Sequence, residues 1–125
     1  MARVMICDDA AFIRMALARI LKAHDHTIVC EAADGEEAVA KFKQFRPEVV
    51  MMDITMNGMD GIEATRQILA IDPLACVIIV SSMGQQNKVV EAINAGAKDF
   101  VVKPFEPDRV MKVIDKNFGA VEDFS

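Results

Sequence analysis

Five polar side chains stand directly after short apolar runs of the sequence, and their types suit phosphate chemistry. Asp8 and Asp9 follow the run "RVMIC", and Asp53 ends the run "EVVMMD". Ser81 follows "CVIIV", and Lys103 follows "FVV". Carboxylates that lie close together repel one another, and a divalent cation removes that cost. Because Mg²⁺ prefers a few hard oxygen ligands and keeps waters that a phosphate can replace, we predict that the three aspartates form a Mg²⁺ site.

The other two side chains suit an anion bound at such a metal. The ammonium of Lys103 supplies a point charge, and the Ser81 hydroxyl can donate a charge-assisted hydrogen bond. A carboxylate beside Mg²⁺ and a lysine can attack phosphorus to give an acyl phosphate, because phosphoryl transfer needs mainly positioning and charge neutralisation. We therefore predict that Asp53 is a nucleophile. The sequence has no glycine-rich phosphate cradle, so the phosphoryl donor must be another molecule.

Each of these residues also has an ordinary structural interpretation. Asp8 and Asp9 could cap a following helix, and Asp53 could simply end a strand. Lys103 before a proline suits a turn, and Ser81 suits the start of a loop. The combination favours a functional site, because four of the five predicted strands end in an acid, a hydroxyl or an ammonium group.

The stretch from Asp53 also begins as a calcium-binding EF-hand loop would. Thr55, Asn57 and Gly58 stand where that loop tolerates them, but its last position requires a bidentate glutamate and holds Ala64. The preceding "VVMM" is typical of a buried strand rather than an amphipathic helix. We therefore do not expect a calcium loop here.

Alternating strand and helix patterns place these residues. Apolar runs predict strands at 3–7, 27–32, 48–53, 76–80 and 100–102. Apolar residues at helical spacing predict helices within 10–21, 35–45, 61–71, 87–96 and 110–118. Continuous apolar runs are typical of strands buried on both faces. We predict an α/β fold, a doubly wound (βα)5 flavodoxin-like architecture with a parallel five-stranded sheet of order 2-1-3-4-5 and helices on both faces. Ligands bind at the carboxyl edge of such a sheet.

Composition narrows the class of protein further. The 125 residues, of which 53% are hydrophobic, predict one domain over 1–118 and an acidic, frayed tail at 119–125. The net charge of -5 and a pI near 5.0 argue against nucleic-acid binding. Three cysteines in apolar runs suggest buried, reduced thiols. Without a signal peptide or a membrane-length apolar run, the sequence predicts a soluble, cytoplasmic protein without membrane contact.

The sequence resembles the receiver domains of two-component response regulators, most closely the single-domain members that act in chemotaxis. The similarity extends from "ICDDAAFIR" through "MMDITMNGMDG" and "VSSMGQQ" to "GAKDFVVKPF". It implies that Asp53 is the phospho-acceptor. It also implies that Asp8, Asp9, Asp53 and the backbone carbonyl of Thr55 hold Mg²⁺.

The same resemblance implies roles at the fourth and fifth strands. Ser81 would be the hydroxyl that moves toward the phosphoryl group, and Lys103 the cation that contacts it, with a cis peptide bond before Pro104. Phe100 stands at the position of the aromatic switch, whose ring turns inward once Ser81 has moved. Phe100 replaces a tyrosine of well-known chemotaxis members, so no partner can contact a phenolic hydroxyl there.

Two further positions bear on how long the phosphoryl group survives. Asn57-Gly58 replaces a proline-containing sequence that many members have, and the freedom of Gly58 would loosen the loop. In the family, the side chains two residues after the acceptor and two after the hydroxyl tune dephosphorylation. These are Thr55 and Met83 here, and Met83 cannot orient an attacking water.

The resemblance implies a stand-alone response regulator that takes a phosphoryl group from a histidine kinase. Phosphorylation would switch a protein-binding surface on the fourth helix, fifth strand and fifth helix. The expected target is a flagellar switch protein, and a phosphatase is a further candidate partner. We expect slow self-dephosphorylation and no substrate turnover. A phosphorelay intermediate or another single-domain signalling receiver is the main alternative.

Two other classes of protein share this architecture. An aspartyl-phosphate hydrolase also uses a strand-ending aspartate with Mg²⁺, but it generally has a second aspartate where this chain has Thr55. A flavin-binding module would need a phosphate-cradling loop after the first strand, where Asp8 and Asp9 would repel the flavin phosphate.

Overall fold

The computed structural model describes residues 1–118, in which five strands alternate with five helices. The strands are β1 (Arg3–Cys7), β2 (Thr27–Ala32), β3 (Val49–Asp53), β4 (Cys76–Ser82) and β5 (Asp99–Lys103). The helices are α1 (Ala11–Ala23), α2 (Gly35–Phe45), α3 (Gly61–Ile71), α4 (Gln86–Asn94) and α5 (Pro107–Asn117). The tail predicted at 119–125 lies outside the described residues.

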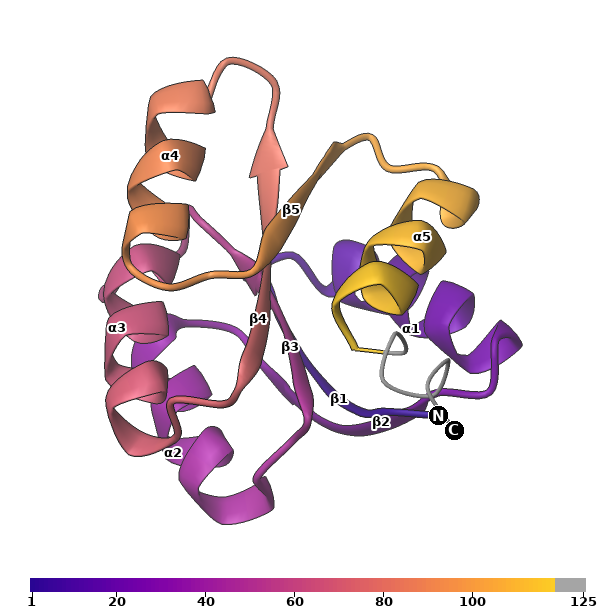
Figure 1. The fold of residues 1–125 in the computed structure, drawn as a ribbon, viewed down its shortest axis with the longest axis horizontal. Helices are drawn as coiled ribbons and strands as arrows, with labels where there is room; N and C mark the ends of the chain where they lie inside the picture. The colour runs from indigo at the N-terminus through magenta and orange to yellow at the C-terminus, as the bar shows by residue number, and fades with distance from the viewer. Residues whose placement is uncertain (119–125) are drawn as a thin grey trace.

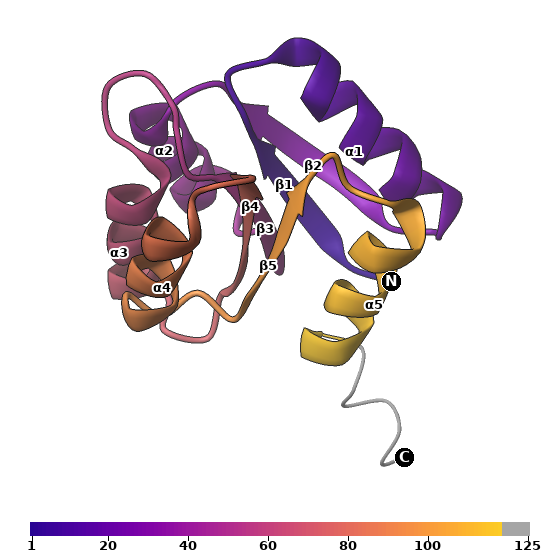
Figure 2. The same ribbon diagram turned by 90° about the horizontal axis from the view of Figure 1, so that it is seen from above.

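The strands form one parallel sheet of order β2-β1-β3-β4-β5, which confirms the predicted fold class. Helices α2, α3 and α4 cover one face, and α1 and α5 cover the other (Figures 1 and 2). All carboxyl ends of the strands therefore meet at one edge. The loops that lead from this edge into α1 and α5 lie on one side of the sheet, and those that lead into α3 and α4 lie on the other.

Side chains of the central strand pack into two separate apolar layers. All five residues of β3 are buried, and alternate ones point to opposite faces. Val50 and Met52 join the core beneath α2, α3 and α4, whereas Val49 and Met51 join the core beneath α1 and α5. Burial on both faces explains why β3 is a continuous apolar run that ends only at Asp53.

Local signals set most helix boundaries. Asp34 and Asp60 cap α2 and α3 by accepting hydrogen bonds from the backbone amides of Glu37 and Glu63. Gly96 follows α4 with a φ of +116°, which suits the residue after a helix end. The predicted ranges of α2 and α3 are confirmed.

The fourth and fifth strands are longer than predicted. β4 continues to Ser82, and β5 reaches from Asp99 to Lys103, because Ser81 and Ser82 pair with Val102 and Lys103. Ser81 and Lys103 therefore lie at paired strand ends rather than in loops. Within residues 1–118, no helix is long and apolar enough to cross a membrane.

Candidate functional site at the carboxyl edge of the sheet

Three aspartates converge where β1 and β3 end side by side. Asp8 and Asp53 are buried, at 1% and 4% exposure, and Asp9 is exposed. One carboxylate oxygen from each lies within 4.8 Å of those of the other two. Cys7 of β1 pairs with Met52 of β3, so the residues that follow them, Asp8 and Asp53, lie side by side at the edge of the sheet. The structure thus brings the three predicted ligands together.

Lys103 reaches this cluster from the end of β5. Its Nζ lies 2.9 Å from Asp8 Oδ2 and 3.6 Å from Asp53 Oδ1. The contact with Asp8 is an ion pair whose geometry leaves the buried Oδ2 without a hydrogen-bond donor in the described part of the chain. The peptide bond between Lys103 and Pro104 is cis, as predicted.

Burial and neighbouring charges act in opposite directions on the pKa values of Asp53 and Lys103. Burial, followed by the charge of Asp8, raises the pKa of Asp53 to about 6, although Lys103 and the backbone amide of Thr55 lower it. Burial lowers the pKa of Lys103, but its contacts with Asp8 and Asp53 outweigh this effect, so the net pKa is raised. At neutral pH, Asp53 is therefore an ionised carboxylate that is held at an energetic cost.

The cluster fits a divalent cation. Among residues 1–118 no hydrogen bond is made to the buried Asp8 Oδ2, although the Lys103 ammonium lies 2.9 Å from it. Asp9 and Asp53 each place a carboxylate oxygen within 4.8 Å of one from Asp8, a set of hard oxygen donors that suits a divalent cation. The alternative that Asp8 or Asp9 caps α1 is wrong, because the N-cap is Ala10 and no side chain caps that helix. Asp8 Oδ1 instead accepts a hydrogen bond from the Ala10 amide at 2.9 Å, which fixes the carboxylate beside its own loop.

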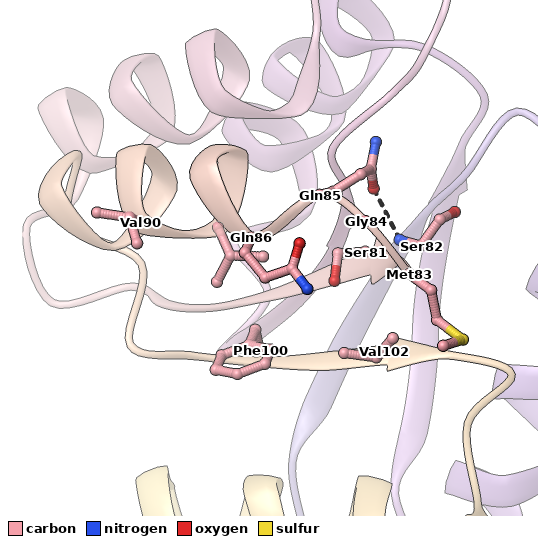
Figure 3. A pocket seen from close by; sticks show the side chains of 10 residues that line it. Ser81, Ser82, Met83, Gly84, Gln85, Gln86, Val90, Phe100 and Val102 are labelled. Atoms are coloured by element: carbon pink, nitrogen blue, oxygen red, sulfur yellow. Dashed lines mark hydrogen bonds between the residues drawn. The ribbon is translucent and has the colours of Figure 1, made fainter.

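An apolar cavity of about 440 Å³ lies beside the site, between α4 and β5. Ser81 lines its inner end, and Phe100, Val102 and Val90 line its walls (Figure 3). The side chain of Ser81 is almost completely buried, whereas Met83 is 79% exposed. The predicted hydroxyl and aromatic switch residues therefore share one cavity that adjoins the acid cluster.

Sequence reasoning missed the polar contacts that hold the loops around the site. Gln85 Nε2 donates to Thr55 Oγ1 at 2.9 Å, and Gln85 Oε1 accepts from the Ser82 amide at 2.7 Å. Arg14 Nη1 donates to the backbone carbonyl of Asp8 at 2.6 Å. Both residues lie within stretches that carry the resemblance, Gln85 in "VSSMGQQ" and Arg14 in "ICDDAAFIR", but the sequence does not show which loop atoms their side chains reach.

A glycine also fixes the position of α3 against the acceptor strand. A Cβ atom at Gly61 would lie 2.0 Å from the backbone carbonyl oxygen of Asp53, so no side chain fits there. The Gly61 amide donates to the carbonyl of Ile54 at 2.8 Å. The loop between Asp53 and α3 is therefore closed tightly behind Asp53.

Comparison with known proteins assigns this arrangement to a family. Residues 4–115 match the response regulator receiver domain, and the chain belongs to that family. The chemotaxis protein CheY of Thermotoga maritima is 53% identical over 114 residues, which are 91% of this chain and 95% of that protein. CheY of Bacillus subtilis is 52% identical over 117 residues, which are 94% and 98% of the two chains.

The fold comparison agrees with the sequence comparison. The crystal structure of the CheX-CheY-BeF3-Mg²⁺ complex from Borrelia burgdorferi includes a chain that superposes with a TM-score of 0.89 at 37% identity. The match covers 93% of this chain and 88% of that chain. The resemblance seen in the sequence, to receiver domains and to chemotaxis regulators in particular, is confirmed.

Proposed function

We propose that this chain is a chemotaxis response regulator in which Asp53 accepts a phosphoryl group from a phosphohistidine of a partner kinase. The observation that carries the proposal is the placement of Lys103 Nζ 3.6 Å from a buried Asp53 carboxylate that two other carboxylates flank. Asp8, Asp9, Asp53 and the backbone carbonyl of Thr55 would hold Mg²⁺. When bound, Mg²⁺ supplies positive charge that offsets the carboxylates and the phosphoryl oxygens.

Asp53 has the ionisation state that a nucleophile needs. With a pKa of about 6, it is mostly deprotonated at neutral pH. One carboxylate oxygen forms a bond to phosphorus, and the bond between phosphorus and the kinase imidazole nitrogen breaks. The imidazole leaves with the bonding electron pair and is neutral once protonated. Lys103, already within 3.6 Å of Asp53, holds positive charge against the transferred group.

The phosphoryl group would act on the neighbouring cavity through Ser81. The buried hydroxyl of Ser81 donates a hydrogen bond to a phosphoryl oxygen, and this draws the end of β4 toward Asp53. The ring of Phe100 then occupies space at the inner end of the cavity. This sequence of movements couples the chemistry to the outer surface of α4, β5 and α5.

Two apolar surfaces suit two kinds of protein partner. On α1, Phe12 and Met15 are 72% and 62% exposed beside the acid cluster, and we assign this surface to the kinase. On α4 and β5, Val90 and Val102 are 59% and 37% exposed, and we assign this surface to the target, a flagellar switch protein. A phosphatase is a third candidate partner. We expect the chain to meet all three partners in the cytoplasm.

The relatives favour the chemotaxis role over the alternatives. Two CheY proteins match this chain at 53% and 52% identity over nearly their whole length. This agreement does not favour a phosphorelay intermediate or an aspartyl-phosphate hydrolase. The hydrolase also lacks support at the site, because Thr55 stands where a second catalytic aspartate would be needed. We therefore propose a single transfer to Asp53 without substrate turnover.

Intact-mass measurement tests the proposal directly. The chain is incubated with acetyl phosphate and Mg²⁺, and we expect a mass increase of one phosphoryl group in the wild type but not in Asp53→Asn. Asp25→Asn is the matched control, because Asp25 is an exposed carboxyl in the turn before β2, at the opposite edge of the sheet. An adduct that persists in Asp53→Asn, or steady release of phosphate from a phosphomonoester, would contradict the assignment.

A further inference from the structure

One side chain ties together the two loops that flank the acceptor from the α3 and α4 side. Gln85 donates to Thr55 Oγ1 across 30 positions of sequence and accepts from the Ser82 amide (Figure 3 shows the latter contact). Thr55 lies two residues after Asp53, and Ser82 follows Ser81 directly. The Gln85 bridge, defined by these two hydrogen bonds, therefore joins the acceptor loop to the strand end that carries the proposed switch hydroxyl.

The ordinary function of a residue at this position does not explain the bridge. Gln85 is the N-cap residue of α4, but its side chain makes no capping hydrogen bond to that helix. Both polar atoms of its amide are instead used between loops, one as donor and one as acceptor. A role at the start of α4 alone therefore does not account for the contact between Gln85 and Thr55.

Sheet topology places the bridge on one side of the acceptor. β3 and β4 are neighbours, with Asp53 paired to Val80, so a link from the β4 end to Thr55 crosses the edge next to Asp53. Lys103 and Asp8 approach Asp53 from the ends of β5 and β1, the strands that lead into α5 and α1, and these two helices cover the other face of the sheet (Figure 2). The bridge therefore closes the side of the site that Lys103 does not cover.

We propose that Gln85 is a positioning residue that holds the Thr55 side chain over the α3 and α4 side of the acceptor and thereby prolongs the life of the phosphoryl group. This inference rests on the proposed phosphorylation of Asp53. Hydrolysis requires a water molecule to reach the phosphorus atom, and the closed bridge blocks its access from the α3 and α4 side. When the bridge opens, Thr55 is free to move and water enters.

The size of the effect follows from the strength of one hydrogen bond. The typical net contribution of a single hydrogen bond changes the ratio of molecules with an open bridge to those with a closed bridge by about 2- to 12-fold. If hydrolysis proceeds from the open form, loss of the Gln85 to Thr55 contact shortens the phosphoryl lifetime by that factor. Loss of both partners together shortens it no further, because the same contact is removed.

Four single variants and one double variant test the bridge. Gln85→Met and Thr55→Val each remove one partner, and Thr55→Val keeps the backbone carbonyl. Thr55→Ser keeps a hydroxyl and should restore a longer lifetime than Thr55→Val. Asn87→Met is the matched control, because Asn87 is an exposed amide of α4 outside the residues that line the cavity. Each protein is loaded with acetyl phosphate and Mg²⁺, freed of donor by desalting, and followed by intact mass.

We expect lifetimes about 2- to 12-fold shorter in Gln85→Met and Thr55→Val, a lifetime in their double variant equal to that of Gln85→Met, and a wild-type lifetime in Asn87→Met. Unchanged or longer lifetimes in the single variants, or multiplied effects in the double variant, would overturn the bridge while leaving the phosphorylation of Asp53 intact. Failure of the wild type to take up phosphoryl would overturn both proposals. Far-UV circular dichroism checks folding, and the two Thr55 variants decide the question if Gln85→Met does not fold.

Discussion

Replacing Asp53 with asparagine removes the proposed acceptor and should nevertheless stabilise the fold at neutral pH. The folded chain raises the pKa of Asp53 from 3.8 to about 6, mainly by burial and then by the charge of Asp8. At about 1.36 kcal/mol per pH unit, ionised Asp53 costs the folded state about 3 kcal/mol relative to the unfolded chain. Asparagine is neutral and of similar size, and the net pKa shift already includes the attraction of Lys103. Solvent screening at the edge of the sheet reduces the full value, so we expect a net gain of about 1–3 kcal/mol.

The gain must depend on pH with a defined sign. Below pH 3.8 the Asp53 carboxyl is protonated in both states, and above pH 6 it is ionised in both, so the whole cost is present only above that range. Wild-type stability should consequently fall, relative to Asp53→Asn, as pH rises from 3.8 to about 6. Near pH 4.5 the cost should be about one third of its value at pH 7.5.

Urea denaturation in the presence of EDTA measures these differences. Unfolding is followed by far-UV circular dichroism, because the chain has neither tryptophan nor tyrosine. Asp25→Asn is the control, since an exposed carboxyl should change the free energy of unfolding by less than about 0.5 kcal/mol. A destabilised Asp53→Asn, or a gain that does not shrink between pH 7.5 and 4.5, would refute the electrostatic account of the site.

Three other variants probe the surroundings of the acceptor. Lys103→Met leaves Asp8 buried without its cation, so the free energy of unfolding in urea should fall by about 2 kcal/mol. Added Mg²⁺ should restore part of this loss, and a loss that is insensitive to Mg²⁺ would argue against a shared ion. Gly61→Ala forces a methyl group against the Asp53 carbonyl, so the free energy of unfolding should fall by more than about 3 kcal/mol, and a normal melting temperature would contradict that close approach. Met83→Glu places a carboxylate where the family tunes hydrolysis, so the phosphoryl lifetime measured by intact mass should shorten; an unchanged lifetime would count against a role for this position.

The fold was predictable because its strands carry an unambiguous signal. The runs that became β1 and β3 are buried on both faces, and such runs can only lie inside a covered sheet. The aspartates that cap α2 and α3, Asp34 and Asp60, mark the starts of the two helices whose ranges were predicted correctly. The end of β4 was less predictable, because Ser81 and Ser82 are polar and their place in the sheet depends on pairing with β5.

The candidate site was predictable only in part. Asp8, Asp53 and Lys103 were found because charged groups stand out at the ends of apolar strands. The contacts of Gln85 and Arg14 with the loops of the site were not found. A glutamine or an arginine on a helix is usually solvated, and only the folded chain shows which backbone or side-chain atom it reaches. Individual polar contacts of this kind leave no periodicity in the sequence.

Lys103 and Gln85 approach the acceptor from opposite faces of the sheet and should act on different quantities. Lys103 carries charge to within 3.6 Å of Asp53, so it governs how readily the phosphoryl group is accepted. Gln85 carries no charge and holds Thr55, so it governs how readily water reaches the product. Within residues 1–118 the two side chains have no hydrogen-bond or ion-pair partner in common, so their effects on the phosphorylated fraction should multiply rather than overlap. We therefore predict that substitutions at Lys103 and Gln85 change the rate of formation and the lifetime of the phosphoryl group independently.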